Sequence, residues 1–139
     1  MTRITSPRFN AFLASPDTFR VYKGKRLVFS SRKDRLAPML DYIDTQSPYE
    51  PDVTVYDRIT GNAAALLLLT IRCQSVYSAL GSEAAIETLQ TAGIRFRFNE
   101  TVDCIKDKSG ENLCPMEQLS LGKTPVEFYR ALKDKIGKP

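Results

Sequence analysis

The sequence predicts an α/β domain in which helices cover both faces of a mixed β-sheet, a three-layer α/β/α arrangement with an N-terminal β-hairpin. The stretch from Val53 to Leu69 passes from a β-branched strand through a glycine turn directly into an apolar helix. Apolar and basic residues alternate from Ile94 to Phe98, which is typical of a strand with one buried face. Two β-rich runs, at 19–22 and 26–29, flank a turn in which Gly24 can adopt a positive φ.

Length and composition are those of an ordinary globular domain. The chain has 139 residues, of which 42% are hydrophobic and 26% charged, so we expect one domain with a core of its own. We assign residues 1–16 to a lead segment and residues 17–139 to a single domain. Three apolar residues of the lead segment have helical spacing, and we expect them to pack against the domain as a lid: Phe9, Phe12 and Leu13.

The first helix after the hairpin is predicted from four apolar residues on one helix face: Leu36, Met39, Leu40 and Ile43. Asp34 is its expected cap, and Pro38 lies close enough to the first turn to be tolerated. Further along, residues 73–79 are predicted to form a strand, and Ser82 is expected to cap a helix that Gly93 ends. We expect the alternating strand that follows to lie near a sheet edge because its arginines form a basic face.

The last helix begins with a capping box, Thr124 to Glu127, that has proline at the first helical position. Three apolar residues are expected on its packed face: Phe128, Leu132 and Ile136. The resulting order of elements is β-β-α-β-α-β-α-α after the lead segment.

Residue types limit the possible chemistry. The chain contains no histidine, so it lacks the commonest general base and the commonest zinc ligand. The odd number and wide spacing of Cys73, Cys104 and Cys114 indicate reduced thiols. Pro7 and Arg8 interrupt the N-terminal segment, and the apolar run Ala63–Leu69 is too short to cross a bilayer, so we expect a cytoplasmic protein with no membrane partner.

The end of the predicted strand at residues 53–60 carries the first candidate ligand-binding residues. Open α/β sheets bind ligands at the carboxyl ends of their strands. Asp57 could hold a ribose hydroxyl there, or it could be a carboxylate that bonds backbone N–H groups of the turn. With Thr60 beside it, Gly61 could admit a phosphate or supply turn geometry, and Asn62 could contact a base or cap the helix.

A second group of candidates lies in the sequence NLCPMEQL. Cys114 at a helix start would face the positive end of the helix dipole, which stabilises a thiolate. The structural alternative is a cap in which Pro115 is the first helical residue and Glu117 folds back as in a capping box. A cysteine nucleophile would also need a base, and a carboxylate beside a thiol raises the pKa of that thiol.

Two motifs, VYDRITGNAAALLLL and CPME, occur in the order and spacing of a known family. The chain resembles an uncharacterised prokaryotic family, a domain of unknown function, whose motifs read about VYDKVVGKAAALL and GxCPME and whose fold is cytidine deaminase-like. The resemblance extends over most of the chain from Tyr22, and Asn62 departs from the usual lysine. It implies a cytidine deaminase-like mixed sheet.

The same resemblance argues against hydrolytic zinc chemistry. Active deaminases have His-x-Glu or Cys-x-Glu at one core helix and Pro-Cys-x-x-Cys at the next. At the matching positions this chain has Asn62 and Ala64, and only Cys114 remains as a ligand. The spacing of Cys104 and Cys114 fits no usual zinc site. We therefore expect no metal ligands, no cofactor and no zinc-dependent deamination; whether the chain is an enzyme stays open.

The sequence favours a zinc-less protein that binds a nucleotide or nucleotide-like small molecule. The candidate ligand-binding residues are Asp57, Thr60, Gly61, Asn62, Cys114 and Glu117. A cysteine-dependent enzyme using Cys114 is the first alternative. The second is an interaction module for nucleic acid or protein, since basic clusters occur near Lys23 and near Lys133, although a net charge of +4 is modest and makes nucleic acid the weaker case. A homo-oligomer stays open.

Overall fold

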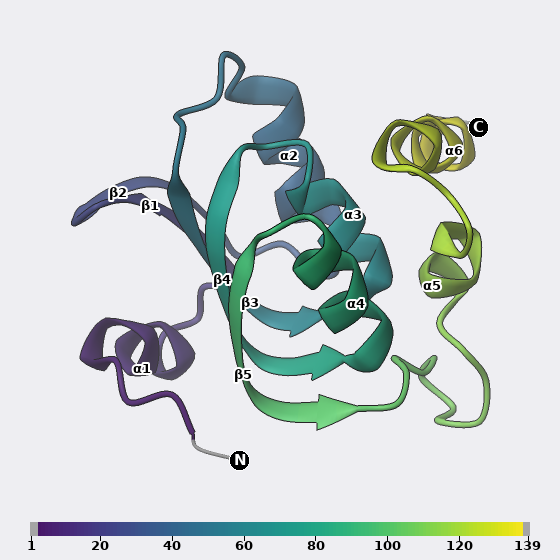
Figure 1. Ribbon diagram of the computed structural model, residues 1–139, viewed down its shortest axis with the longest axis horizontal. Helices are drawn as coiled ribbons and strands as arrows, with labels where there is room; N and C mark the ends of the chain where they lie inside the picture. Colours follow the sequence, from purple (N-terminus) through teal and green to yellow (C-terminus); the bar gives the residue numbers. More distant parts are fainter. Residues whose placement is uncertain (1–2, 138–139) are drawn as a thin grey trace.

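The computed structural model describes residues 3–137, which form a five-stranded mixed sheet flanked by helices (Figure 1). The expected lead segment and domain extend to residues 1–2 and 138–139, which lie outside the described residues. The elements are α1 (Pro7–Ala14), β1 (Phe19–Lys23), β2 (Arg26–Ser31), α2 (Ala37–Thr45), β3 (Val53–Thr60), α3 (Asn62–Leu68), β4 (Cys73–Ser82), α4 (Glu83–Thr91), β5 (Arg95–Val102), α5 (Pro115–Ser120) and α6 (Pro125–Gly137).

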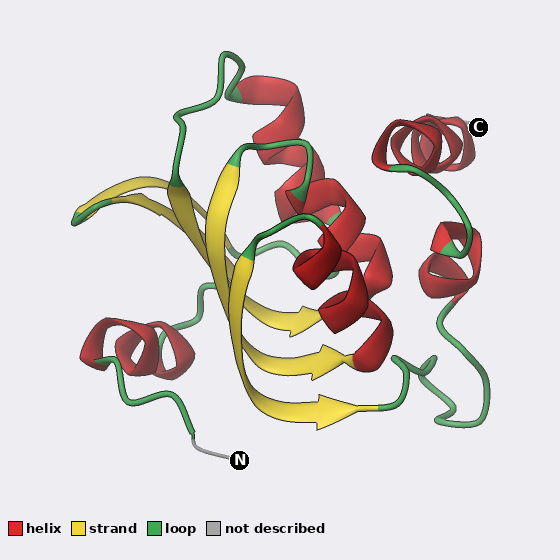
Figure 2. Ribbon diagram, in the orientation of Figure 1, coloured by secondary structure: helices red, strands yellow, loops and turns green. Residues whose placement is uncertain are grey.

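The strands are arranged in the order β2-β1-β3-β4-β5. β1 pairs antiparallel with β2 and with β3, whereas β3, β4 and β5 are parallel, with α3 and α4 as the connections (Figure 2). Gly24 has a φ of 60° in the β1–β2 turn, as the hairpin requires. The predicted mixed sheet, the N-terminal hairpin and the edge position of the strand after Gly93 are confirmed.

Helices lie on both faces of the sheet. α1 packs on one face, and α2, α3 and α4 pack on the other; α5 and α6 lie outside α3 on that second side (Figure 1). None of the described helices is long and apolar enough to span a membrane. The carboxyl ends of the three parallel strands therefore point toward the starts of α3 and α4 and toward the segment that leads to α5.

The two faces of the sheet have different cores. On the α1 face, Phe9 and Phe12 are fully buried in an aromatic cluster, and the Phe9 ring meets the Tyr56 ring edge to face at 5.2 Å between centroids. The opposite face is mostly aliphatic, and the whole of α3 is buried within it. Small residues at 63–65 let α3 approach the sheet closely, so the polar groups at its N-terminus are buried as well.

Local expectations are confirmed at some helix ends. Ser82 caps α4, since its hydroxyl accepts the Ala85 N–H at 3.1 Å. In the capping box of α6, Glu127 Oε1 accepts the Thr124 N–H at 2.9 Å and Thr124 Oγ1 accepts the Glu127 N–H at 3.2 Å.

Other local expectations are wrong. Asp34 does not cap α2, because Arg35 has a φ of 59° and Leu36 becomes the N-cap. β4 continues to Ser82 instead of ending at residue 79, because it stays paired with β5 over that length. Ile136 is 59% exposed, because α6 has 13 residues and the α3 and α5 helices that it contacts have seven and six.

Candidate functional site

The joint between β3 and α3 is closed by a carboxylate from α5. Glu117, 6% exposed, accepts the Asn62 N–H on Oε1 and the Ala63 N–H on Oε2, both at 2.8 Å. Gly61 is the N-cap, with extended backbone at φ −92°. A Cβ at Gly61 would overlap the Glu117 carboxylate, so glycine is required here for close approach and not for a positive φ.

The expected capping box at α5 is therefore wrong. Cys114 is the N-cap of α5 and Pro115 its first residue, but the Cys114 side chain makes no capping hydrogen bond with any described residue. Glu117 reaches across to α3 instead of folding back. The physical reason is that the N–H groups at the start of α3 are buried, and leaving them unpaired would cost more than leaving the exposed start of α5 uncapped.

Asn62 is the first residue of α3, and its side chain joins three helices. Its Nδ2 donates to Ser120 Oγ of α5 at 3.0 Å, and its Oδ1 accepts from Thr88 Oγ1 of α4 at 2.5 Å. The expected helix cap at Asn62 is wrong, because Gly61 takes that position. The Asn62 amide is thus engaged through both its nitrogen and its oxygen.

Asp57 is a buried carboxylate close to this joint. It is 8% exposed, and burial raises its pKa to about 7, although the Arg58 N–H on its Oδ1 at 2.8 Å works in the opposite direction. Thr60 is fully buried and its hydroxyl is 3.4 Å from Asp57 Oδ2. Asp57 and Thr60 therefore contact each other within the fold.

A cavity of about 500 Å³ lies between the starts of α3 and α5, at the carboxyl end of β3; we call it the α3–α5 pocket. Three of the six candidate residues line it, namely Gly61, Cys114 and Glu117, whereas Asp57, Thr60 and Asn62 do not. Its other lining residues are Arg35, Leu36, Ile59, Ala63, Ala64, Ile105, Lys106, Asp107, Lys108, Ser109, Pro115 and Met116.

The charged rim of the pocket was not predicted. Arg35, Lys106 and Lys108 are exposed cations on this rim, and Asp107 is the one acid of the 105–109 segment. The segment folds back on itself, because Lys106 bridges to Leu113 and the Cys114 N–H donates to the Ile105 carbonyl at 2.9 Å. Basic residues near 32–35 are visible in the sequence, but no local pattern shows that they meet residues 106–108.

The three cysteines occupy different environments. Burial raises the pKa of the Cys73 thiol to about 12, so Cys73 is a core residue. Cys114 is half-buried and lines the α3–α5 pocket, and all three cysteines are free thiols. Within residues 3–137, no three Cys, Asp or Glu side chains converge closely enough to hold a metal ion.

The lead helix does not cover this pocket. We expected it to act as a lid, and it does pack against the domain, but α1 lies on the opposite face of the sheet (Figure 1). The reason is the aromatic cluster, which fixes α1 against Tyr56 and Tyr77.

Comparison with known proteins agrees with this architecture. Residues 10–136 match the profile of the family described as Domain of unknown function (DUF1893). The chain belongs to the DUF1893 family. A crystal structure of a DUF1893 family protein (TM1506) from Thermotoga maritima superposes with a TM-score of 0.81 over 97% of this chain and 95% of that one, at 22% identity. That likeness shows a shared fold. No curated protein gives a significant match.

Proposed function

We propose that this DUF1893 protein binds a nucleotide or nucleotide-like small molecule in the α3–α5 pocket, on a zinc-less fold of the cytidine deaminase type. The observation that carries the proposal is one cavity of about 500 Å³ that has an apolar wall and three cations at its rim. That volume falls within the usual range of about 300–1,000 Å³ for small-molecule sites.

The apolar wall suits a flat ring. Leu36, Ile59 and Met116 line the cavity with hydrocarbon and thioether groups, and the small side chains of Ala63 and Ala64 leave room at the start of α3. A nucleobase would exclude water from this wall, which favours binding by the area it buries. Polar atoms for recognition are available from Ser109 and from the segment around it.

Side chains supply the positive charge for phosphate. Glu117 already takes the N–H groups of Asn62 and Ala63, so these two donors are not available to a ligand. The cations Arg35, Lys106 and Lys108 stand at the mouth of the pocket, where ammonium and guanidinium groups attract phosphate oxygens. We therefore shift the proposed phosphate contacts from Asn62 to these three residues.

The proposal excludes deamination through a zinc-bound water. Asn62 stands where the resemblance places a metal ligand, and its amide is already engaged by Ser120 and Thr88. Ala64 stands where it places the carboxylic acid that moves the proton, and an alanine cannot do so. What remains at the site is the capacity to bind and orient a ligand.

The direct test is a thermal-shift and calorimetric series with AMP, ADP, ATP and ADP-ribose, and with inorganic phosphate as the minimal probe. A ligand present at 100 times its Kd stabilises the folded state by about 2.7 kcal/mol, which raises Tm by several degrees. Ile59→Trp fills the pocket from an exposed position and should abolish the shift. Leu27→Trp, at a similarly exposed residue of β2, is the matched control and should retain it.

A Lys106→Glu, Lys108→Glu double variant separates charge from shape. It should weaken the phosphorylated ligands at least tenfold and leave a nucleoside without phosphate nearly unaffected. Absence of any shift with all five probes, at millimolar concentration and low salt, would overturn the proposal.

A second candidate is a cysteine-dependent enzyme, which is favoured by the position of Cys114 in the same pocket. It requires rapid alkylation of Cys114 with a pH midpoint below about 8. The measurement is iodoacetamide labelling in a Cys104→Ser background, followed by mass spectrometry. A slow reaction with a midpoint near that of a free thiol would remove this candidate, whereas protection of Cys114 by a nucleotide would support the binding proposal.

A further inference from the structure

The two edges of the sheet are built differently. β5 runs beside β4 in unbroken parallel register, from Ser75 opposite Arg95 to Ser82 opposite Val102, and no described strand pairs with its outer edge. At the other edge, the β1–β2 register shifts between Val21 and Tyr22, which leaves an extra residue in β2. Such bulges blunt an edge strand against further pairing. β5 lacks that protection.

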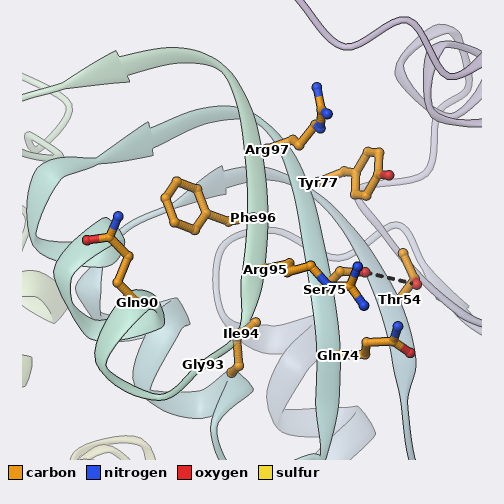
Figure 3. Close-up of a pocket in the computed structure, with 10 residues that line it drawn as sticks. All are labelled: Thr54, Gln74, Ser75, Tyr77, Gln90, Gly93, Ile94, Arg95, Phe96 and Arg97. Carbon is orange, nitrogen blue, oxygen red and sulfur yellow. Dashed lines mark hydrogen bonds between the residues drawn. The ribbon is translucent and has the colours of Figure 1, made fainter.

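A hollow of about 770 Å³ opens along the amino-terminal half of β5 (Figure 3). Arg95 and Arg97 project from one face of the strand, beside Ser75 and Tyr77 of β4, while Phe96 projects from the other (Figure 3). The full lining is Thr54, Gln74, Ser75, Tyr77, Gln90, Gly93, Ile94, Arg95, Phe96 and Arg97. The lining contains two cations and no acid.

These arginines have few partners within the protein. Arg97 is exposed and forms no hydrogen bond or ion pair with any residue between 3 and 137 in this structure. Arg95 reaches the side-chain oxygen of Gln74 at 2.9 Å when the Gln74 amide is oriented to donate to the Asp52 carbonyl. The lead segment contacts β5 only further along, where the Ile4 N–H donates to Asn99 Oδ1 at 2.7 Å. The amino half of the edge is therefore open.

We propose that the outer edge of β5 receives an extended acidic peptide of a partner protein as an added strand. An edge strand presents alternate N–H and C=O groups that an incoming strand can pair. Side chains two residues apart on a strand are separated by about 6.5–7 Å, so acids at alternate positions of the peptide would match Arg95 and Arg97 in spacing. Residues opposite one another on neighbouring strands lie close enough for ion pairs, and arginine can hold a carboxylate through two hydrogen bonds.

Charge argues against a second copy of this chain as the occupant. Antiparallel β5–β5 pairing centred on the open half would set Arg95 of one copy beside Arg97 of the other. Like charges directly opposite each other destabilise a pair of strands. An acidic strand reverses this interaction, so the same two residues that discourage self-pairing favour a partner of opposite charge.

The aromatic residues argue against single-stranded nucleic acid. Such ligands stack their bases on exposed rings next to the cations. On the arginine face, the Tyr77 ring is already packed against Phe9 at 5.9 Å and Tyr56 at 5.5 Å between centroids. Phe96 packs beside Phe98 on the other face. No free stacking platform accompanies the two arginines.

The experiment uses a fluorescein-labelled nine-residue peptide that alternates glutamate with valine, measured by anisotropy on the full chain at low salt. We expect a Kd in the micromolar range, and at least tenfold weaker binding of the same peptide with lysine in place of glutamate. Arg95→Glu with Arg97→Glu should reverse this preference. Arg130→Glu with Lys135→Glu makes the same charge change on exposed residues of α6 and should not.

Backbone pairing is tested separately from charge. Two peptides N-methylated at alternate residues, one in each phase, keep every carboxylate and remove half of the donors. Strand addition predicts that one phase loses binding at least tenfold and the other does not, and that amides in β5 gain protection from hydrogen exchange. Absence of acidic-peptide binding, equal binding by both methylated peptides, or tighter binding of a 12-nucleotide single strand would each overturn the proposal.

Discussion

Two charged residues of opposite sign attach helices to opposite faces of the sheet near the end of β3. On the α1 face, the Arg58 guanidinium donates to backbone carbonyls at and after the end of α1, those of Phe12, Leu13, Ser15 and Asp17. On the other face, the Glu117 carboxylate accepts the first two N–H groups of α3. Each charge meets the end of a helix whose dipole attracts it.

The difference between these two contacts lies in what else holds the helix. α1 is also fixed by the aromatic cluster, in which Phe9 and Phe12 are completely buried. α5 has six residues and contributes half-buried apolar side chains, Met116 and Leu119, so the buried Glu117 is a larger part of its attachment. We infer that the α1 face depends mainly on packing and that the wall of the α3–α5 pocket depends on one carboxylate.

The sharpest way to break this comparison is Glu117→Ala. It leaves two buried N–H groups of α3 without acceptors, and we expect a loss of about 2–4 kcal/mol in the free energy of unfolding, measured with urea. Glu127→Ala is the matched control, because Glu127 holds the same place in α6 but is exposed, and its loss should be clearly smaller. Equal losses for the two variants would contradict the assigned role of Glu117.

Asp57 tests the cost of a buried carboxylate that no helix end compensates. Because burial raises its pKa from 3.8 to about 7, the folded state holds the proton more tightly than the unfolded chain does. Its contribution to the free energy of unfolding is therefore highest below about pH 4 and falls as the pH rises to about 7.

We expect Asp57→Asn to stabilise the protein by about 2 kcal/mol at pH 8 and by almost nothing at pH 4, from urea unfolding of both chains at each pH. The comparison between chains removes the effect of the other carboxylates, which titrate in both. A constant difference at the two pH values would show that ionisation of Asp57 is not the cause.

Arg58→Met should have the smallest effect of the three. The apolar chain of methionine keeps the packing but removes every donor, and we expect a loss of about 1–2 kcal/mol. Hydrogen exchange should accelerate in α1 before it accelerates in the sheet. Arg97→Met, at an exposed residue of β5, should change stability by less than about 0.5 kcal/mol. A larger loss for Arg58→Met than for Glu117→Ala would reverse our ranking of the two faces.

Local sequence patterns predicted much of this architecture. The alternation at 94–98, the turn at Gly24 and the capping box at Thr124 each depend on residues close together in the chain, so their chemistry fixes the local backbone. The same reasoning failed at Glu117, because Glu117 lies 54 residues from Ala63 and no local rule connects them. It also failed at the pocket rim, where Arg35 meets residues 106–108.

The amino-acid sequence by itself determined the order of strands and helices, the hairpin, the edge strand and the absence of histidine, because each follows from local periodicity, turn chemistry or composition. Only the tertiary structure decided that Glu117 closes the start of α3, that Arg58 holds α1 and that three distant cations share one pocket. Buried backbone groups must find partners wherever the packed chain brings a suitable charge, and that choice depends on contacts between segments far apart in the sequence.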